Sequence, residues 1–113
     1  MRSALRASGS SLPVLVTLDG QFHDPEAPLL YADDLAAVRG DGIFETLLVR
    51  DGQPCLLEAH LDRLERSAEL MDLPEPHGDA WRWASNAAAA RWVELSDDEG
   101  VMRWVYSRGR ESG

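Results

Sequence analysis

The sequence predicts an α+β fold, a two-layer sandwich in which one antiparallel sheet is covered by two helices. Short strand-like runs separated by tight-turn residues fill the first half of the chain. Two longer stretches follow, in which hydrophobic residues recur three and four positions apart, and one more strand-like run lies near the end. Strands gathered ahead of helices favour this class. A length of 113 residues suits one domain with one modest core.

The first two predicted strands are short. Residues 1–12 are rich in Ser, Ala and Gly and are predicted to form a flexible N-terminal tail. Residues 14–18 read Val-Leu-Val-Thr-Leu, which is a strand-like run. The dipeptide Asp-Gly at 19–20 offers a tight turn, so a return strand is expected to begin at residues 21–22.

The third predicted strand, residues 43–50, is the clearest in the chain. The run Gly-Asp-Gly at 40–42 breaks regular structure before it, and the Asp-Gly pair at 51–52 is the strongest hairpin signal. Residues 54–57 are predicted to pair back as its partner, with the proline that opens this run at a strand start or an edge, because proline cannot donate to the ladder. We expect Cys55 in this run to be a small buried hydrophobic residue rather than a nucleophile.

Two amphipathic helices are predicted from residue 58 onward. The first ends at Leu73-Pro74, and its apolar stripe comprises Leu57, Leu61, Leu64, Ala68 and Met71. Asp79 is expected to cap the second. The stripe of this helix comprises Trp81, Ala84, Ala88, Trp92 and Leu95. A polar turn at 96–100 then leads to a last strand over residues 101–106.

Composition excludes several classes of function. A net charge of −9 and a pI near 4.6 argue against nucleic acid and anionic membrane surfaces as partners. No apolar run approaches the ~20 residues of a membrane span, so a cytoplasmic location is the default expectation. The single cysteine cannot form an internal disulfide, and with three scattered histidines it does not predict a metal site.

Two neighbouring motifs carry a family resemblance. The first, at 39–46, reads Arg-Gly-Asp-Gly-Ile-Phe-Glu-Thr, and the second, at 58–64, reads Glu-Ala-His-Leu-Asp-Arg-Leu. In this order and at this distance they resemble the N-terminal signature of the class IV aminotransferases, the fold-type IV enzymes that use pyridoxal 5′-phosphate (PLP). The resemblance covers residues 14–109 and implies the small N-terminal domain of that family. We therefore predict one small domain over residues 13–109.

The resemblance assigns a cofactor contact to Arg63. In the family, the arginine of this His-x-x-Arg-Leu stretch grips the phosphate of PLP, and here the stretch begins at His60. A planar guanidinium on the first turns of a helix suits that task. Without the motif, Arg63 would be interpreted as a surface residue paired with Asp62 or Glu65. We expect His60 to be a packed helix residue rather than a catalyst.

The same resemblance implies residues around the substrate, a small amino compound. In the family, the aromatic at the position of Phe44 faces the active site and Glu45 helps to hold the region together. From the residues alone, Phe44 is balanced between pocket wall and core. Arg39 replaces the family's usual aromatic residue and could meet a substrate carboxylate. Arg103 and Arg108, on or after the last strand, are the other predicted substrate contacts, with solvent-exposed arginines as the plainer alternative.

The chain contains no lysine, since all 11 basic residues are arginines. Because the family attaches PLP to a lysine, no catalytic residue is predicted here, and these residues alone are expected to be inactive. The simplest interpretation is an N-terminal part of a homodimeric enzyme whose large domain follows residues 110–113. The motifs favour 4-amino-4-deoxychorismate lyase, which releases 4-aminobenzoate and pyruvate for folate synthesis. Branched-chain and D-amino-acid transaminases are close alternatives, and a non-catalytic stand-alone binding domain is an alternative of another class.

Overall fold

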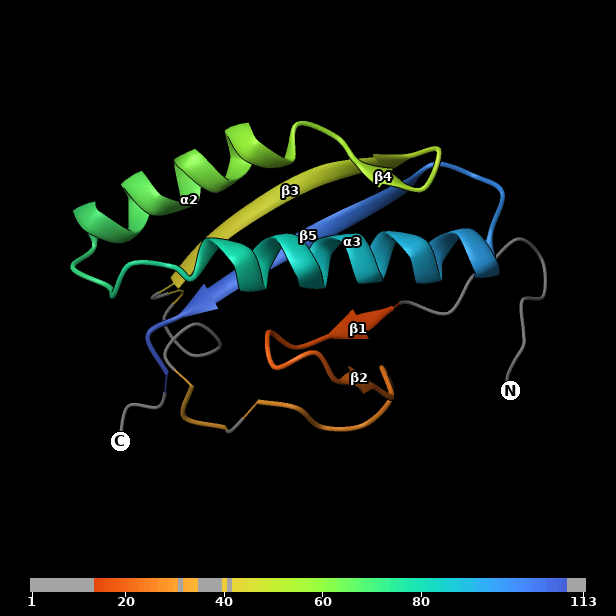
Figure 1. Cartoon of the computed structure of the whole chain (residues 1–113). Coiled ribbons are helices and arrows are strands. Elements are labelled where there is room, and N and C mark those ends of the chain that lie inside the picture. Colours follow the sequence, from red (N-terminus) through yellow and green to blue (C-terminus); the bar gives the residue numbers. More distant parts are fainter. Residues whose placement is uncertain (1–13, 31, 35–39, 41, 110–113) are drawn as a thin grey trace.

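The computed structural model of the chain describes residues 14–30, 32–34, 40 and 42–109, and shows a sheet covered by helices (Figure 1). The predicted tail (1–12) and the predicted connection (110–113) lie outside the described residues, as does Arg39. In chain order the elements are β1 (Leu15–Val16), β2 (Phe22–His23), β3 (Gly42–Arg50), β4 (Gln53–Pro54), α2 (Leu57–Leu70), α3 (Gly78–Leu95) and β5 (Gly100–Ser107).

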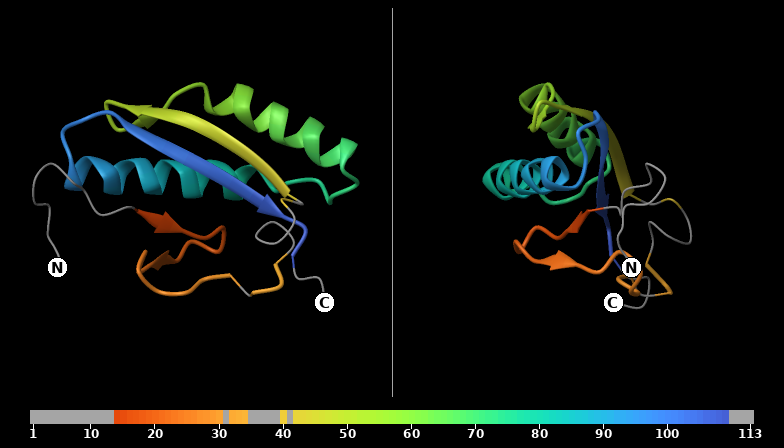
Figure 2. Two further views of the ribbon diagram at one scale, coloured as in Figure 1. Left: turned by 180° about the vertical axis from the view of Figure 1, so that it is seen from behind. Right: turned by 90° about the vertical axis from the view of Figure 1, so that its right-hand side faces the viewer.

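Strands β3, β4 and β5 form an antiparallel sheet in the order β4-β3-β5. Both described helices lie on one face of this sheet, which confirms the predicted two-layer α+β class (Figure 2). The β1–β2 hairpin forms a separate two-stranded ladder beside α3 instead of joining the sheet. The prediction of a single sheet is therefore wrong for this hairpin, whose pairing is limited to the two register pairs Leu15–His23 and Val16–Phe22.

The β3–β5 ladder is the longest strand pairing among the described residues. It runs from Gly42 paired with Ser107 to Val49 paired with Gly100. Burial alternates strictly along β3, because successive side chains of a strand point to opposite faces. Ile43 and Leu47 pack into the core, whereas Phe44 and Thr46 face away from the helices. The predicted strand at 43–50 is confirmed.

The core lies between the ladder and the two helices. The predicted stripe of α2 is confirmed, with Leu61, Leu64 and Ala68 all at most 1% exposed. From the sheet and from α3, Trp104 and Trp81 meet these side chains, with ring centroids 5.1 Å apart. Burying a leucine-sized side chain stabilises a fold by roughly 1.5–3 kcal/mol, so this cluster fixes α2 against β3.

The segment predicted as a strand at 54–57 turns into a helix instead. Pairing stops at Pro54, after which the backbone N–H of Cys55 donates to the carbonyl of Leu48 over 2.7 Å. Leu56 then adopts a left-handed conformation with φ of 56°, and Leu57 begins α2. This conformation is unfavourable for leucine, which is why sequence patterns did not predict it. Cys55 is half-buried rather than buried, so that expectation is also corrected.

The far end of α2 is closed by backbone hydrogen bonds. The helix ends at Leu70, earlier than predicted, and Asp72 takes a left-handed φ of 61°. The N–H of Leu73 donates to the carbonyl of Ala68 (2.8 Å), and that of Asp72 donates to Glu69 (3.2 Å). This is the Schellman arrangement, in which the final carbonyls of a helix are satisfied.

The second helix starts one residue earlier than its predicted cap. His77 precedes α3 in an extended conformation without a side-chain cap, and Asp79 lies in the first turn. There the Asp79 carboxylate accepts from Arg82 over 2.9 Å, so the predicted cap is wrong. Of the predicted stripe, Trp81 and Ala84 are buried, while the later members are half-buried. Among the described helices, none is both long and apolar enough to cross a membrane.

Candidate functional site

Glu45 is a buried carboxylate at the centre of a polar cluster on β3. Strand alternation places it on the same face as Ile43 and Leu47, and its side chain is only 6% exposed. Two residues of α2 meet it. Arg63 donates from Nη2 to Oε1 (2.9 Å) and from Nε to Oε2 (3.0 Å). His60 lies with Nδ1 2.7 Å from the same Oε1.

The electrostatics of the cluster favour the charged forms of Glu45 and Arg63. Burial raises the pKa of Glu45, but the hydrogen bonds from Arg63 and His60 outweigh this effect, so the pKa of the carboxyl lies below its usual value. The hydrogen bond to Glu45 raises the pKa of Arg63 in turn. A buried carboxylate is tolerated only when such partners replace its water. Glu45 and Arg63 are therefore an ion pair at neutral pH.

The guanidinium of Arg63 has one engaged edge and one open edge. Glu45 occupies the Nε–Nη2 edge, while the side chain of Arg63 as a whole is 58% exposed. Among the described residues, none accepts a hydrogen bond from Nη1. The Nη1–Nη2 edge can therefore hold an oxyanion through two parallel hydrogen bonds, which is the geometry that phosphate prefers with arginine.

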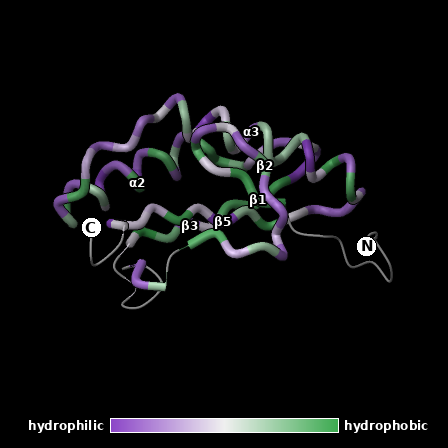
Figure 3. The backbone as a smooth tube through the Cα atoms, turned by 90° about the horizontal axis from the view of Figure 1, so that it is seen from below, coloured by the Kyte–Doolittle hydropathy of each residue, from purple (hydrophilic) through white to green (hydrophobic). Residues whose placement is uncertain are grey.

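The opposite face of the ladder carries other predicted residues. Phe44 is 50% exposed and lies opposite Val105, and Arg103 lies opposite Thr46. Phe44 and Arg103 are thus diagonal neighbours on one open face. Figure 3 shows β3 and β5 side by side, with hydrophobic and hydrophilic positions interspersed along both. An aromatic ring beside a guanidinium on an exposed sheet face can contact a ligand that is partly apolar and partly anionic.

Arg108 lies at the end of this ladder, where the chain leaves β5. Its Nη2 donates to the carbonyl of Met71 at the end of α2, over 2.6 Å. Ser107 next to it donates from Oγ to the buried carboxylate of Asp34, over 2.5 Å. The structure thus places Phe44 and Arg103 together, with Arg63 on the helix side of β3 and Arg108 at the C-terminal end of α2.

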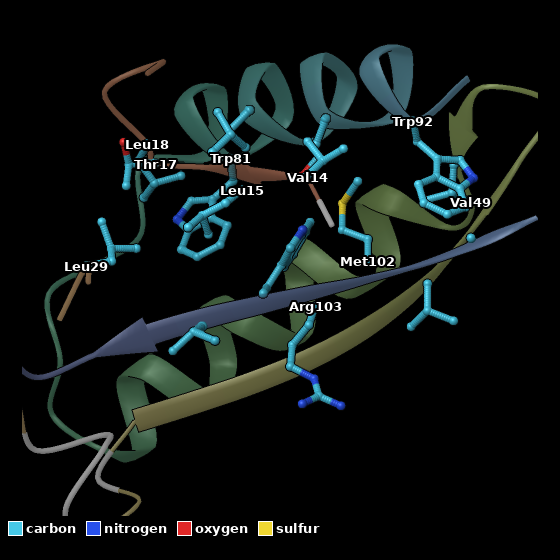
Figure 4. Close-up of a pocket in the computed structure, with 18 of the residues that line it drawn as sticks. Val14, Leu15, Thr17, Leu18, Leu29, Val49, Trp81, Trp92, Met102 and Arg103 are labelled. Atoms are coloured by element: carbon cyan, nitrogen blue, oxygen red, sulfur yellow. The ribbon is translucent and has the colours of Figure 1, made fainter. Parts of the chain in front are cut away.

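A large cavity lies elsewhere, on the helix side of β5. Its volume is about 570 Å³, and it is bounded by α3, β5 and the β1–β2 hairpin, with Leu15, Trp81 and Met102 among its walls. In Figure 4 the side chain of Arg103 points away from these apolar side chains. Of the predicted site residues that the structure describes, Arg103 alone lies at the cavity wall, whereas Phe44, Arg63 and Arg108 do not line it. Within the part of the chain that the structure describes, no group of three or more His, Cys, Asp or Glu residues could hold a metal ion.

The sequence predicts a role for Arg63 but not its contacts with Glu45 and His60. The resemblance implies only that Glu45 helps to hold the region together, and His60 is expected only to pack. The alternation that placed Ile43 and Leu47 inward also placed Glu45 inward, which is a usable signal. An acidic residue on the buried face of a strand requires a cation nearby.

Comparison with known proteins gives one family. A model described as amino-transferase class IV matches residues 42–113. The bifunctional aminodeoxychorismate lyase / D-amino acid transaminase of Mycobacterium tuberculosis is 64% identical over 100 residues, which is 88% of this chain and 35% of that protein.

Solved structures are similar over the same region. A hypothetical aminotransferase from Mycobacterium tuberculosis in its PLP-bound form superposes with a TM-score of 0.86 at 64% identity, covering 88% of this chain and 35% of that one. The 4-amino-4-deoxychorismate lyase of Pseudomonas aeruginosa gives a TM-score of 0.63 at 37% identity, covering 74% and 29%. The chain therefore spans about a third of the length of these relatives.

Proposed function

The chain belongs to the amino-transferase class IV family, and from this premise we propose that it forms the small domain of a PLP-dependent 4-amino-4-deoxychorismate lyase. The reaction would split aminodeoxychorismate into 4-aminobenzoate and pyruvate. Support comes from a relative at 64% identity that is named for this lyase activity, and from the likeness to a second lyase. The observation that carries the proposal is the open edge of Arg63, held outward by Glu45 within the family motif.

The residues present fit the phosphate of PLP. Arg63 offers two N–H groups on its open edge, and the buried carboxylate of Glu45 holds the guanidinium in place. When bound, PLP supplies an electron sink for the carbanion formed at the substrate. We assign the wall of the site to Phe44, and contacts with the substrate carboxylates to Arg103, with Arg39 and Arg108 as further candidates. The lysine that moves the proton must come from outside these 113 residues.

A second activity has specific support. The same relative is also named as a D-amino acid transaminase, so transfer of an amino group to an oxo acid is the alternative function. Both reactions would use the same cofactor and the same arginine. We also propose that the enzyme is a cytoplasmic homodimer acting in folate synthesis. Branched-chain transamination and a non-catalytic binding role are the remaining alternatives.

The test uses the full-length gene product. Its intact mass and a visible absorption band of bound PLP establish whether a lysine-bearing domain accompanies these residues. Turnover of aminodeoxychorismate, and of D-alanine with an oxo acid as amino acceptor, is then measured side by side. Cleavage faster than transamination supports the lyase, and the reverse order supports the transaminase. A gene product of 12.5 kDa without a chromophore would contradict the proposed enzyme.

A further inference from the structure

His60 lies between the core and the polar cluster. It sits on α2 with its side chain 17% exposed. Its ring meets Trp104 edge to face, with centroids 6.5 Å apart and planes at 73°. Trp104 is itself 4% exposed and packs on Trp81, so the contact restricts how the imidazole can turn. The ring is thus held by the core while its Nδ1 faces Glu45.

The distances assign the proton on this ring. Nδ1 lies 2.7 Å from Oε1 of Glu45 and 3.5 Å from Nη2 of Arg63. An unprotonated Nδ1 would place its lone pair against a carboxylate oxygen at hydrogen-bond distance, which is repulsive. With the proton on Nδ1, the short contact is a charge-assisted hydrogen bond. His60 therefore donates to Glu45, and the longer contact with Arg63 is incidental.

This bond fixes the plane of the carboxylate. The terminal torsion of a glutamate is broad and roughly two-fold, so a carboxylate with one partner can rotate. Oε1 of Glu45 accepts from His60 and from Nη2 of Arg63, while Nε of Arg63 lies 3.0 Å from Oε2 and 3.2 Å from Oε1. A fixed carboxylate plane fixes the guanidinium plane, because the paired donors of arginine are coplanar.

We propose that His60 is a positioning residue for phosphate recognition: by orienting Glu45, it turns the open Nη1–Nη2 edge of Arg63 toward the phosphate of the cofactor. The inference rests on the proposed function, since it takes Arg63 to be the phosphate contact. It adds a role for His60 that lies between packing and catalysis. Most of the side chain of Arg63 is exposed, so its orientation depends on this pair of supports.

The test compares two ligands on the full-length protein. PLP and pyridoxal share a ring and an aldehyde but differ in the phosphate, so the ratio of their dissociation constants isolates phosphate recognition. His60→Leu removes the donor and keeps an apolar side chain against Trp104. His60→Asn keeps an N–H close to the position of Nδ1, and His60→Gln places one further out. Glu58→Gln, on the same helix, is the control outside the cluster.

We expect His60→Leu to weaken PLP binding about 3- to 10-fold, the value of one ordinary neutral hydrogen bond, with pyridoxal binding unchanged. His60→Asn should restore most of the ratio, and His60→Gln should not. Equal losses for both ligands, or equal rescue by Asn and Gln, would overturn the positioning role. If His60→Leu does not fold, the comparison of Asn with Gln decides. A wild-type protein that binds neither ligand would refute the proposed function, and the inference with it.

Discussion

Two arginine–glutamate pairs involve α2, and they use the same edge of the arginine for different ends. Arg63 and Arg82 each give their Nε–Nη2 edge to a glutamate, Glu45 and Glu58 respectively. The Nη1 group of Arg82 donates a hydrogen bond to Asp79, whereas Nη1 of Arg63 has no acceptor among the described residues. The carboxylate of Glu45 is 6% exposed, and that of Glu58 is 64% exposed.

Because both pairs share the same geometry, the geometry of an ion pair alone does not identify a ligand-binding site. The pair of Arg82 is complete and solvated, and such pairs add little to stability. In the pair of Arg63, the carboxylate of Glu45 is buried beside the core. The guanidinium of Arg63 lies at the surface, with only its Nε–Nη2 edge bonded to Glu45. A buried carboxylate on one edge of the guanidinium and a free pair of N–H groups on the other is the arrangement expected where a ligand accepts the remaining hydrogen bonds.

The largest expected effect is a difference in PLP affinity between variants of Arg63 and Arg82. In the full-length protein, Arg63→Ala should weaken PLP binding about 10- to 100-fold, because charge-assisted contacts with the phosphate are lost. Arg82→Ala should leave it unchanged. Titration of each apo protein with PLP, followed by absorbance, measures both. Equal affinities in the two variants would remove Arg63 from the cofactor site.

The two glutamates should differ in stability. In Glu45→Gln an amide N–H replaces one carboxylate oxygen, so a buried N–H group faces the donors of Arg63 and His60 without an acceptor. We expect the free energy of unfolding of the chain to fall by about 1–3 kcal/mol. Glu58→Gln, which is exposed, should have no measurable effect. Urea unfolding followed by tryptophan fluorescence compares them, and a larger loss in Glu58→Gln would reverse the assignment.

The dependence of stability on acidic pH should also differ between Glu45 and Glu58. The folded pKa of Glu45 is depressed, so its contribution to stability is present in full above the ordinary glutamate pKa of about 4.3. That contribution is lost as the pH falls through the lower, folded pKa. Stability measured from about pH 6 to pH 3 should therefore decline less steeply in Glu45→Gln than in wild type. The pKa of Glu58 is also lowered, by its hydrogen bond to Arg82, but salt should screen that exposed pair.

The smallest expected effect concerns the start of the helix that carries Arg63 and Glu58. Leu56 has a left-handed φ of 56° and a side chain 75% exposed, so Leu56→Gly removes backbone strain and loses little packing. We expect a gain of about 0.5–1 kcal/mol in the free energy of unfolding. Thermal unfolding measures it, with Asp72→Gly as the matched change at the other end. Asp72→Gly should gain less, because aspartate tolerates this conformation better.

The regular parts of the fold were predictable because their periods are long and uninterrupted. Alternation along β3 and the stripe of α2 each report which side chains face the core, and both were confirmed. The start of α2 was predicted to within one residue, but the left-handed conformation of Leu56 before it was not. That conformation contradicts the preference of leucine, so no local sequence pattern indicates it.

The candidate site was predictable only in part. Arg63 followed from its motif, whereas the burial of Glu45 required weighing charge against strand alternation. Its bonds to Arg63 and His60 join β3 to α2 across a hairpin, and no local pattern reports such contacts. The exposure of Phe44 was equally undecided, because an aromatic residue on a strand suits both a core and an open face.

The ladder of β3 and β5 has a consequence for the order in which the domain assembles. The two strands are separated by both helices, so their pairing must wait for a long loop to close. Closure is least costly at the end where Val49 meets Gly100, since less chain lies between them than between Gly42 and Ser107. Pairing that starts from that end brings Phe44 opposite Val105 late, so the end of the ladder that carries Phe44 should be the last to form.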